Sequence, residues 1–351
     1  RKLLMEVKHC KTQEEVNKGV NITNSERIES FEINHFGGIV LDEYSILKGQ
    51  DSKTKTRLIE LCQRIPYRLS CTATPSPNDF MEIGNQAEFL GIMSSTEMLS
   101  MFFTHDGGET SKWRLKGHGR VKFWEWLASW AVCIKKPSDL GFSDEGYILP
   151  SLNFNEHRIT TEKKVEGQLF QFEAQTLSER ITARRETVED RVKKAVELSE
   201  GKKQLIIWYN LNSESDLLEK LIPESVNIQG ADSIEDKEEK LLKFVEGDAR
   251  VLITKPSMFG FGLNLQFCQN MAFVGLNDSY EQIYQAVRRC YRFGQKKPVN
   301  VHFIAADIEG AVLKNIKRKE EQAQEMSREM VKHMVNFTKK KLKGTKQEVM
   351  K

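Results

Sequence analysis

Three side chains in the last quarter of the chain have types and spacing suited to binding a polyphosphate. Gln285, Arg289 and Arg292 stand at positions i, i+4 and i+7, and on a helix such positions share one face over about two turns. Two guanidinium groups on one face repel each other unless an anion lies between them, and their donors match the oxygens of a nucleotide polyphosphate. The spacing alone fits a phosphate-binding helix and a solvated basic helix face equally well.

Two carboxylates in the first half could handle a metal ion and a water molecule. Asp42 and Glu43 follow the apolar run 38–41, which is typical of a buried parallel strand. An Asp at such a strand end can hold the Mg²⁺ of a nucleoside triphosphate, and a neighbouring Glu can orient or deprotonate the attacking water. A pair of solvated carboxylates is the alternative.

Two hydroxyl groups stand at the end of the next apolar run. Thr72 and Thr74 follow residues 67–71, and Pro75 ends the strand because it lacks a backbone donor. A helix expected over 51–64 joins the two runs, which gives the strand, helix, strand order of a parallel sheet. Polar residues just past the carboxyl ends of such strands are the expected chemical site; an ordinary strand exit is the alternative.

A glycine-rich segment later in the chain could let the backbone approach a ligand closely. Gly260 and Gly262 precede Asn264, whose amide can both donate and accept hydrogen bonds. Just before them, Lys255 and Ser257 could reach a phosphate of a nucleic acid. A flexible loop before a helix is the alternative.

A fifth candidate lies near the start of the chain. A helix could begin at Thr23, Asn24 or Ser25. The free N–H groups of a helix N-terminus bind phosphate oxygens well. Simple helix capping is the alternative.

The second half of the chain predicts a parallel sheet with helices between its strands. Strands are expected at 204–209, 226–229, 250–254, 271–274 and 299–304, and helices at 213–221, 234–245 and 280–291. A polar helix over about 161–200 leads into this sheet, and a charged helix with a basic tail follows residue 308.

Residues 85–150 interrupt this alternation and hold four of the five tryptophans. Five apolar residues there recur at helical spacing and predict an amphipathic helix: Phe123, Trp126, Leu127, Trp130 and Ile134. The favoured interpretation is a stripe that packs on the first domain, and the alternative is a platform for stacked bases.

Length and composition indicate a two-domain cytoplasmic protein. The 351 residues suit two α/β domains rather than one core. The net charge is +3, so binding to nucleic acid would need a local basic surface. No apolar run approaches the ~20 residues that span a bilayer. The six scattered cysteines indicate reduced thiols, not disulfides or a zinc site.

The order of these features resembles superfamily 2 helicases and translocases, in the branch close to the Swi/Snf remodellers and in a compact form seen in bacteria and phages. Similarity to the family's Walker B box and to its motifs III, V and VI lies at residues 40–48, 71–75, 260–265 and 285–295, respectively. Residues 136–140 also resemble the stretch that ends the first lobe.

The resemblance implies an α/β fold with two RecA-like parallel-sheet lobes, of which the first is incomplete, a helical insertion and a C-terminal helix. It divides the chain into a partial ATP-binding lobe at 1–160 with the insertion at about 85–150, a linker helix at 161–200, a second lobe at 201–310, and a charged helix with a basic tail at 311–351.

The resemblance also implies a role for each candidate in a cleft that binds ATP and Mg²⁺. Asp42 would associate with Mg²⁺, and Glu43 would activate the attacking water. Arg289 and Arg292 would be arginine fingers, and Gln285 would hold the γ-phosphate. The remaining candidates would couple hydrolysis to lobe movement (Thr72, Thr74), bind the nucleotide (Gly260, Gly262, Asn264) or contact DNA (Thr23, Asn24, Lys255, Ser257).

Two departures from the family pattern stand out. Ser45 follows the acidic pair where many relatives carry His or Asp, and the phosphate-binding G-x-x-x-x-G-K-[ST] loop does not occur. In this family that loop lies upstream of Lys8, so the sequence is expected to be an N-terminally truncated piece that hydrolyses little ATP alone.

The predicted function is an ATP-dependent motor that moves on DNA, without strand separation as the favoured mode. The predicted location is the cytoplasm of a bacterial or phage-infected cell. Two other interpretations stay open: a degenerate helicase module that binds DNA without nucleotide, and the motor subunit of a restriction-type complex.

Overall fold

The computed structural model describes residues 7–43, 47, 53–106, 109–159, 185–258, 263–306 and 310–349. The chain forms two compact units, one from Arg1–Cys133 with Arg328–Lys351 and the other from Ile134–Ser327. The expected boundary near residue 160 differs from this division, because residues 134–159 group with the second unit. The helix α10 (Gly310–Val349) contributes to both units.

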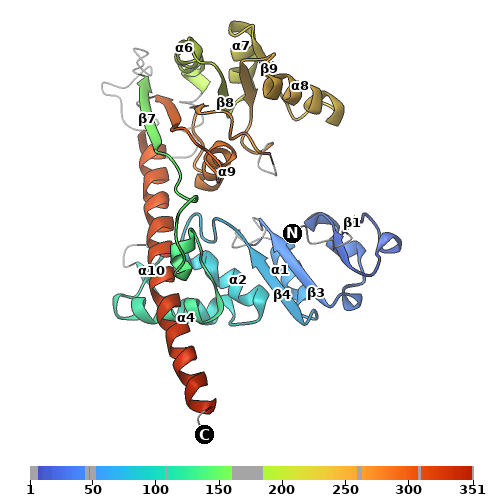
Figure 1. Ribbon diagram of the computed structural model, residues 1–351, viewed down its shortest axis with the longest axis vertical. Coiled ribbons are helices and arrows are strands. Elements are labelled where there is room, and N and C mark those ends of the chain that lie inside the picture. Colours follow the sequence, from blue (N-terminus) through green and yellow to red (C-terminus); the bar gives the residue numbers. More distant parts are fainter. Residues whose placement is uncertain are drawn as a thin grey trace. The chain divides into compact units, whose positions relative to one another are not determined.

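The second unit is built on one sheet of six parallel strands (Figure 1). The strand order across the sheet is β7-β12-β11-β8-β10-β9. The strands are β7 (Leu152–Ile159), β8 (Leu205–Tyr209), β9 (Ser225–Asn227), β10 (Val251–Thr254), β11 (Asn270–Val274) and β12 (Val299–Ala306). The central strand β8 is apolar and buried along its whole length because helices cover both faces of the sheet.

Helices pack on both faces of this sheet. α6 (Val188–Ser199) and α7 (Asn212–Leu221) bury apolar side chains against one face. α8 (Ile234–Glu246), α9 (Tyr280–Cys290) and the first turns of α10 pack on the other face. This three-layer arrangement confirms the predicted α/β class, and the five expected strands and three expected helices all form within a few residues of their predicted bounds. In the stretch expected as a linker helix, α6 is the described part, and residues 160–184 lie outside the described residues.

The edge strand β7 was not among the expected strands. It pairs in parallel with β12 over eight residue pairs, from Leu152↔Val299 to Ile159↔Ala306. Its sequence, L-N-F-N-E-H-R-I, mixes polar and apolar residues because an edge strand is only partly covered. A parallel partner almost 150 residues away in the chain leaves no local sequence signal.

Two histidines meet where β7 and β12 pair. The Nε2 atom of His157 lies 2.9 Å from Nδ1 of His302. Burial, followed by the charge of His157, lowers the pKa of His302 to about 4, and burial also lowers the pKa of His157. Both imidazoles are therefore neutral in the folded protein near pH 7.

This pair predicts a loss of stability in mild acid. Between the ordinary histidine pKa of 6.5 and the folded value of about 4 for His302, the unfolded chain binds more protons than the folded one. The contribution is fully present above about pH 6.5 and is lost as the pH falls towards 4. Thermal melting across this range should show a fall in melting temperature that His302→Gln reduces and that His118→Gln, at an exposed histidine, leaves intact. An equal fall of melting temperature with pH in both variants would contradict this prediction.

The first unit contains three small sheets (Figure 1). β1 (Val7–His9) pairs with β2 (Val20–Ile22) and β3 (Gly38–Asp42) with β4 (Tyr67–Cys71), both in parallel, while β5 (Phe103–Asp106) and β6 (Glu109–Leu115) are antiparallel. Its helices are α1 (Lys53–Cys62), α2 (Ile83–Leu90), α3 (Ser95–Phe102) and α4 (Arg120–Trp130). Short 3₁₀ helices occur at Gln13–Glu15, Ser25–Ser30, Ile33–His35, Phe80–Glu82 and Gly117–Gly119, and in the second unit at Pro137–Leu140.

The β3–β4 pair is only part of a sheet. Strand, helix and strand form as expected, but Val40, Tyr67 and Leu69 are exposed on one face. Parallel sheets in α/β proteins are normally buried on both faces. The first unit therefore matches the expectation of an incomplete lobe.

The aromatic helix α4 packs within the first unit. Phe123 and Trp124 are buried and contact the ring of Phe80, with centroid distances of 6.4 and 5.2 Å. This burial supports packing over base stacking for the stripe. Ile134 is not on the helix, because α4 ends at Trp130. Trp124 is buried on the same helix, although it was not part of the predicted apolar stripe.

Among the described helices, none has both the length and the apolar content needed to cross a membrane.

Candidate functional site

The arginine helix α9 ends at Cys290, two residues before Arg292. Ser279 caps the start by accepting a hydrogen bond from the backbone N–H of Gln282 at 3.3 Å. Gln285 and Arg289 are thus on the helix, one turn apart. Arg292 is not: it lies in the turn that follows, so the expected three-residue face is wrong for this residue.

The turn after α9 is held by one buried amide. Nε2 of Gln295 donates to the carbonyl oxygens of Gln266 at 2.7 Å and Cys290 at 3.2 Å. Its Oε1 accepts from the backbone N–H groups of Lys296 and Lys297. Gln295 therefore satisfies a carbonyl at the helix end and fixes the turn that carries Arg292.

The same turn is joined to the segment that follows the glycine-rich loop. The backbone N–H of Leu265 donates to the carbonyl of Arg289 at 2.9 Å. Gly294 has φ of +94°, and a Cβ there would lie 3.1 Å from Oε1 of Gln266. The structure thus brings together two of the predicted motifs, the end of the glycine loop and the arginine helix.

The glycine loop itself is described only from residue 263 onward. Gly260 and Gly262 lie outside the described residues, so their predicted role stays a prediction. Asn264 is exposed, and its Oδ1 accepts from the backbone N–H of Gln266 at 3.2 Å. Its side chain therefore shapes the local turn.

Two buried thiols lie beneath this turn. Cys268 and Cys290 share a hydrogen bond, which together with burial holds the pKa of Cys290 well above its usual range. The thiol of Cys290, which lies between Arg289 and Arg292 in the sequence, is therefore neutral and packs in the core.

Lys255 stands at the carboxyl end of β10 beside the start of α7. Its Nζ donates to Oδ1 of Asn212 at 2.7 Å and lies 5.3 Å from the centroid of the Tyr209 ring. Ser257 is exposed in the adjoining turn. Both residues thus lie at the edge of the sheet where the carboxyl ends of strands collect ligands.

In the first unit, the acidic pair stands at the end of β3. Asp42 pairs in register with Cys71 and is exposed, and the backbone N–H of Glu43 donates to the carbonyl of Cys71 at 3.0 Å. Glu43 has φ of +48°, in the left-handed region that non-glycine residues rarely adopt. Such backbone strain is concentrated at functional sites.

The hydroxyl pair follows β4, next to the acidic pair. The backbone N–H of Thr74 donates to Oγ1 of Thr72 at 3.1 Å, and Thr74 is buried. The register of β3 with β4 places the acidic and hydroxyl pairs at one edge of this sheet, as the sequence predicted.

A buried polar network behind these residues escaped the sequence analysis. Asn85 on α2 accepts a hydrogen bond from Nζ of Lys55 at 3.2 Å and donates to the carbonyl of Leu47 at 2.8 Å. Gln86 donates to the carbonyl of Pro75. These side chains anchor the segments that follow β3 and β4. Paired Asn-Gln within an otherwise apolar helix was the available signal.

The N-terminal candidate differs from its expectation. Asn24 is the N-cap of a 3₁₀ helix of six residues, Ser25–Ser30, and its side chain makes no capping hydrogen bond. Oγ1 of Thr23 is buried, with no hydrogen-bond partner among the described residues. The helix that begins here is a 3₁₀ helix, and so short a helix aligns few free N–H groups. The contact of Thr23 and Asn24 with a phosphate stays a prediction.

A fully buried ion pair lies under the second sheet's carboxyl edge. Arg191 on α6 contacts both Glu214 on α7 and the hydroxyl of Thr187. The other carboxylate oxygen of Glu214 accepts from the backbone N–H groups of Asn210 and Leu211, each at 2.9 Å. Sequence analysis saw only a polar helix here, since nothing local pairs these two charges.

Gly275, just after β11, is packed against this ion pair. It has φ of +68°, and a Cβ there would lie 2.6 Å from Oε1 of Glu214. The position therefore requires glycine for both its backbone conformation and its space.

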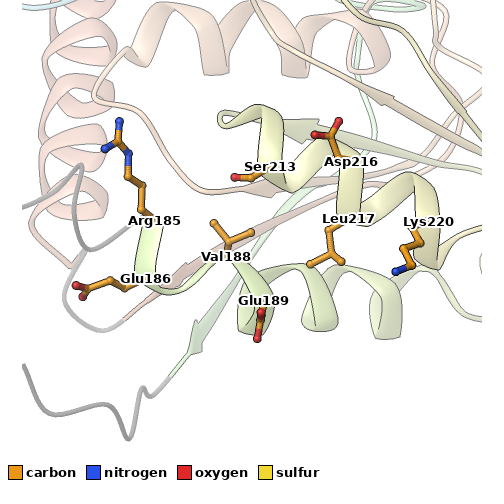
Figure 2. A pocket seen from close by; sticks show the side chains of 8 residues that line it. All are labelled: Arg185, Glu186, Val188, Glu189, Ser213, Asp216, Leu217 and Lys220. Atoms are coloured by element: carbon orange, nitrogen blue, oxygen red, sulfur yellow. The ribbon is translucent and has the colours of Figure 1, made fainter.

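A shallow pocket of about 620 Å³ lies between the start of α6 and one side of α7 (Figure 2). Val188 and Leu217 supply its apolar lining. Both charge signs surround it, from Arg185, Glu186, Glu189, Asp216 and Lys220. None of the predicted site residues lines it, and its mixed charge selects no ligand class.

The described residues contain no group of three or more His, Cys, Asp or Glu that could hold a metal together. A single carboxylate at Asp42 still fits Mg²⁺ in a nucleotide complex, because this ion keeps several waters and takes its other ligands from phosphate oxygens.

Comparison with known proteins identifies part of the second unit. Residues 187–294 match the family model described as the helicase conserved C-terminal domain. No curated protein matches the chain. Among solved structures, the chain is similar to one described as the crystal structure of the C-terminal part of the Fun30 ATPase domain, with 19% identity and a TM-score of 0.33. The similarity covers 42% of this chain and 54% of that one, so the chain spans about half of that structure's length.

The matched segment contains α9, the turn with Arg292 and the described end of the glycine loop. The second unit therefore contains a segment that is similar to the helicase conserved C-terminal domain.

Proposed function

We propose that this chain is part of an ATP-dependent motor that translocates on DNA. The observation that carries the proposal is the joining of the glycine loop's end to the arginine helix inside a helicase C-terminal domain. A hydrogen-bonded connection between these two segments lets a change at a bound phosphate alter the backbone that contacts DNA. The branch favoured by the sequence resemblance moves on DNA without separating its strands.

The proposed roles fall to two groups of residues, one in each unit. Arg289 and Arg292 would offset the charge that develops on the phosphoryl oxygens, and Gln285 would hold the γ-phosphate. Glu43 would orient and deprotonate the attacking water. Thr72 and Thr74, joined by a hydrogen bond beside the acidic pair, would couple hydrolysis to movement.

Asp42 would hold Mg²⁺, which when bound neutralises charge on the phosphate oxygens. The exposed carboxylate at the end of β3 suits this role. Nucleotide binding also needs a phosphate-binding loop, and no G-x-x-x-x-G-K-[ST] segment occurs in the 351 residues.

DNA would contact the exposed carboxyl edges of the strands. Lys255 and Ser257 in the second unit, and Thr23 and Asn24 in the first, are the proposed backbone contacts. Such binding weakens as salt rises, because phosphate contacts release counterions.

The decisive experiment is ATP hydrolysis by the full natural protein with no DNA, single-stranded DNA and duplex DNA. We expect hydrolysis that DNA stimulates, with duplex at least as effective as single strands. Hydrolysis that is absent, or that is unaffected by any DNA, would remove the motor proposal.

A second candidate function is a DNA-binding module that uses no nucleotide. DNA binding by the full natural protein that persists without any ATP binding, measured by calorimetry, would select this alternative.

A further inference from the structure

An exposed aromatic stack stands beside the arginine turn. The rings of Tyr147 and Phe293 lie with centroids 5.0 Å apart and an interplanar angle of 30°. The two residues are nevertheless 55% and 62% exposed. Large rings normally bury most of their surface, so a stacked pair left open to solvent needs an explanation.

The stack is held from both sides. Tyr147 lies at the end of a turn closed by its N–H on the carbonyl of Asp144, at 2.9 Å. The hydroxyl of Tyr291 donates to the carbonyl of Pro150 at 2.9 Å, which joins the two segments that carry the rings. Phe293 precedes Gly294, whose backbone conformation and Gln295 fix the turn. The rings therefore meet on an anchored frame.

The surroundings of Phe293 are strongly basic. From Arg288 to Asn300 the sequence has five basic residues and no acidic one. Lys296 and Lys297 are exposed, and among the described residues neither forms an ion pair. Their backbone N–H groups donate to Oε1 of Gln295 at 2.9 and 3.1 Å, so the backbone that carries the two lysines is fixed.

Carboxylates near the other ring are mostly engaged. Asp144 accepts from the backbone N–H of Ser138 at 2.8 Å and lies 3.3 Å from Nζ of Lys136. Asp139 accepts from the backbone N–H groups of Lys135 and Lys136. Glu145 is the remaining acidic side chain of this turn. The stack thus borders a positive surface on the Phe293 side.

We infer that the Tyr147–Phe293 stack is a platform for unpaired bases of a single-stranded nucleic acid, with Lys296 and Lys297 contacting its phosphates. Open aromatic faces next to lysines are the features that bind single strands, because every base has a face that can stack. In a duplex those faces are covered by neighbouring base pairs. A protein partner fits less well, since lysine is depleted in protein interfaces.

This inference deepens the proposed function, on which it rests for the presence of a nucleic acid, and it names the strand form that one surface recognises. It does not use the nucleotide site. It can therefore be tested by equilibrium binding without ATP, using the 351-residue chain.

The test compares three fluorescent probes by anisotropy: an oligothymidylate of about 16 nucleotides, an abasic strand of the same length, and a duplex. The unsubstituted chain should bind oligothymidylate more tightly than the abasic strand. Phe293→Ala and Tyr147→Ala should each weaken oligothymidylate binding by about 5- to 100-fold and leave abasic binding unchanged. Phe293→Trp should retain the preference.

Matched variants separate stacking from general effects. Phe142→Ala removes another exposed ring, 68% exposed, for which the described residues give no ring contact, and it should change nothing. The double variant Lys296→Gln with Lys297→Gln should weaken both strands and reduce the dependence of binding on salt. Melting temperatures should match in all variants, because the side chains are exposed.

Two results would overturn the platform: no preference for bases over an abasic strand in the unsubstituted chain, or ring variants that weaken both strands equally. If Phe293→Ala loses the preference for oligothymidylate and also lowers the melting temperature, Phe293→Leu separates the two effects, because leucine keeps apolar packing and removes the ring. Because ATP is absent, these outcomes leave the motor proposal to be judged by hydrolysis alone.

Discussion

Replacing Arg289 by alanine is expected to lower DNA-stimulated ATP hydrolysis in the full natural protein by about 10³- to 10⁵-fold. The guanidinium would offset charge that develops only as the phosphoryl group transfers, so its loss should reduce turnover far more than nucleotide affinity. The fold should persist, because the contact with Leu265 uses the main-chain carbonyl of Arg289. Steady-state hydrolysis with saturating DNA measures the effect.

The neighbouring arginine provides the control. The guanidinium of Arg288 lies 5.2 Å from the centroid of the Tyr284 ring and 5.5 Å from that of Tyr291. Arg288→Ala should therefore change packing at the helix end and leave most of the turnover. Arg289→Lys keeps the charge without the planar fork and should rescue only a small part of the rate. Turnover in Arg289→Ala that equals that of Arg288→Ala would remove Arg289 from the nucleotide site.

Breaking the buried ion pair should have the largest effect on stability. Arg191→Ala leaves the carboxylate of Glu214 buried without its cation, and removal of one partner of such a pair costs about 3–5 kcal/mol. Two backbone N–H groups at the start of α7 still bind that carboxylate, so the lost energy comes from the missing guanidinium. Urea unfolding gives the free energy of unfolding directly.

Two comparisons make this result specific. Lys194 on the same helix pairs with Glu197 at the surface, and Lys194→Ala should change the free energy of unfolding little, as exposed pairs do. Arg191→Met combined with Glu214→Leu should cost less than Arg191→Ala alone, because no charge then remains buried. A loss in Arg191→Ala no greater than that in Lys194→Ala would show that the pair contributes nothing to stability.

The sequence predicted the structure best where every residue of a segment is buried. Strand β8 is buried at all five positions, so its run L-I-I-W-Y carries its own evidence for a covered parallel strand. The acidic pair and the hydroxyl pair were correctly placed at one sheet edge, because parallel strands joined by a helix must end on the same side.

Prediction failed where distant residues decide the structure. Arg292 was expected to share a helix face with Gln285 and Arg289 because its spacing continues the pattern. However, α9 ends at Cys290, and Arg292 lies in a turn that the buried amide of Gln295 and the positive φ of Gly294 fix. The β7–β12 pairing and the Arg191–Glu214 contact likewise join residues with no common local pattern. The antiparallel pairing of β5 with β6 was also not predicted.

The eight-pair register between β7 and β12 has a practical consequence for dissecting this protein. The recognisable family segment starts at residue 187, whereas the sheet that supports it includes Leu152–Ile159. A recombinant piece trimmed to the family limits would lack both β7 and β12 and would leave the backbone groups on one side of β11 unpaired. An uncovered edge of this kind recruits other chains and promotes aggregation. The smallest self-sufficient portion thus begins at least 35 residues before the recognisable one.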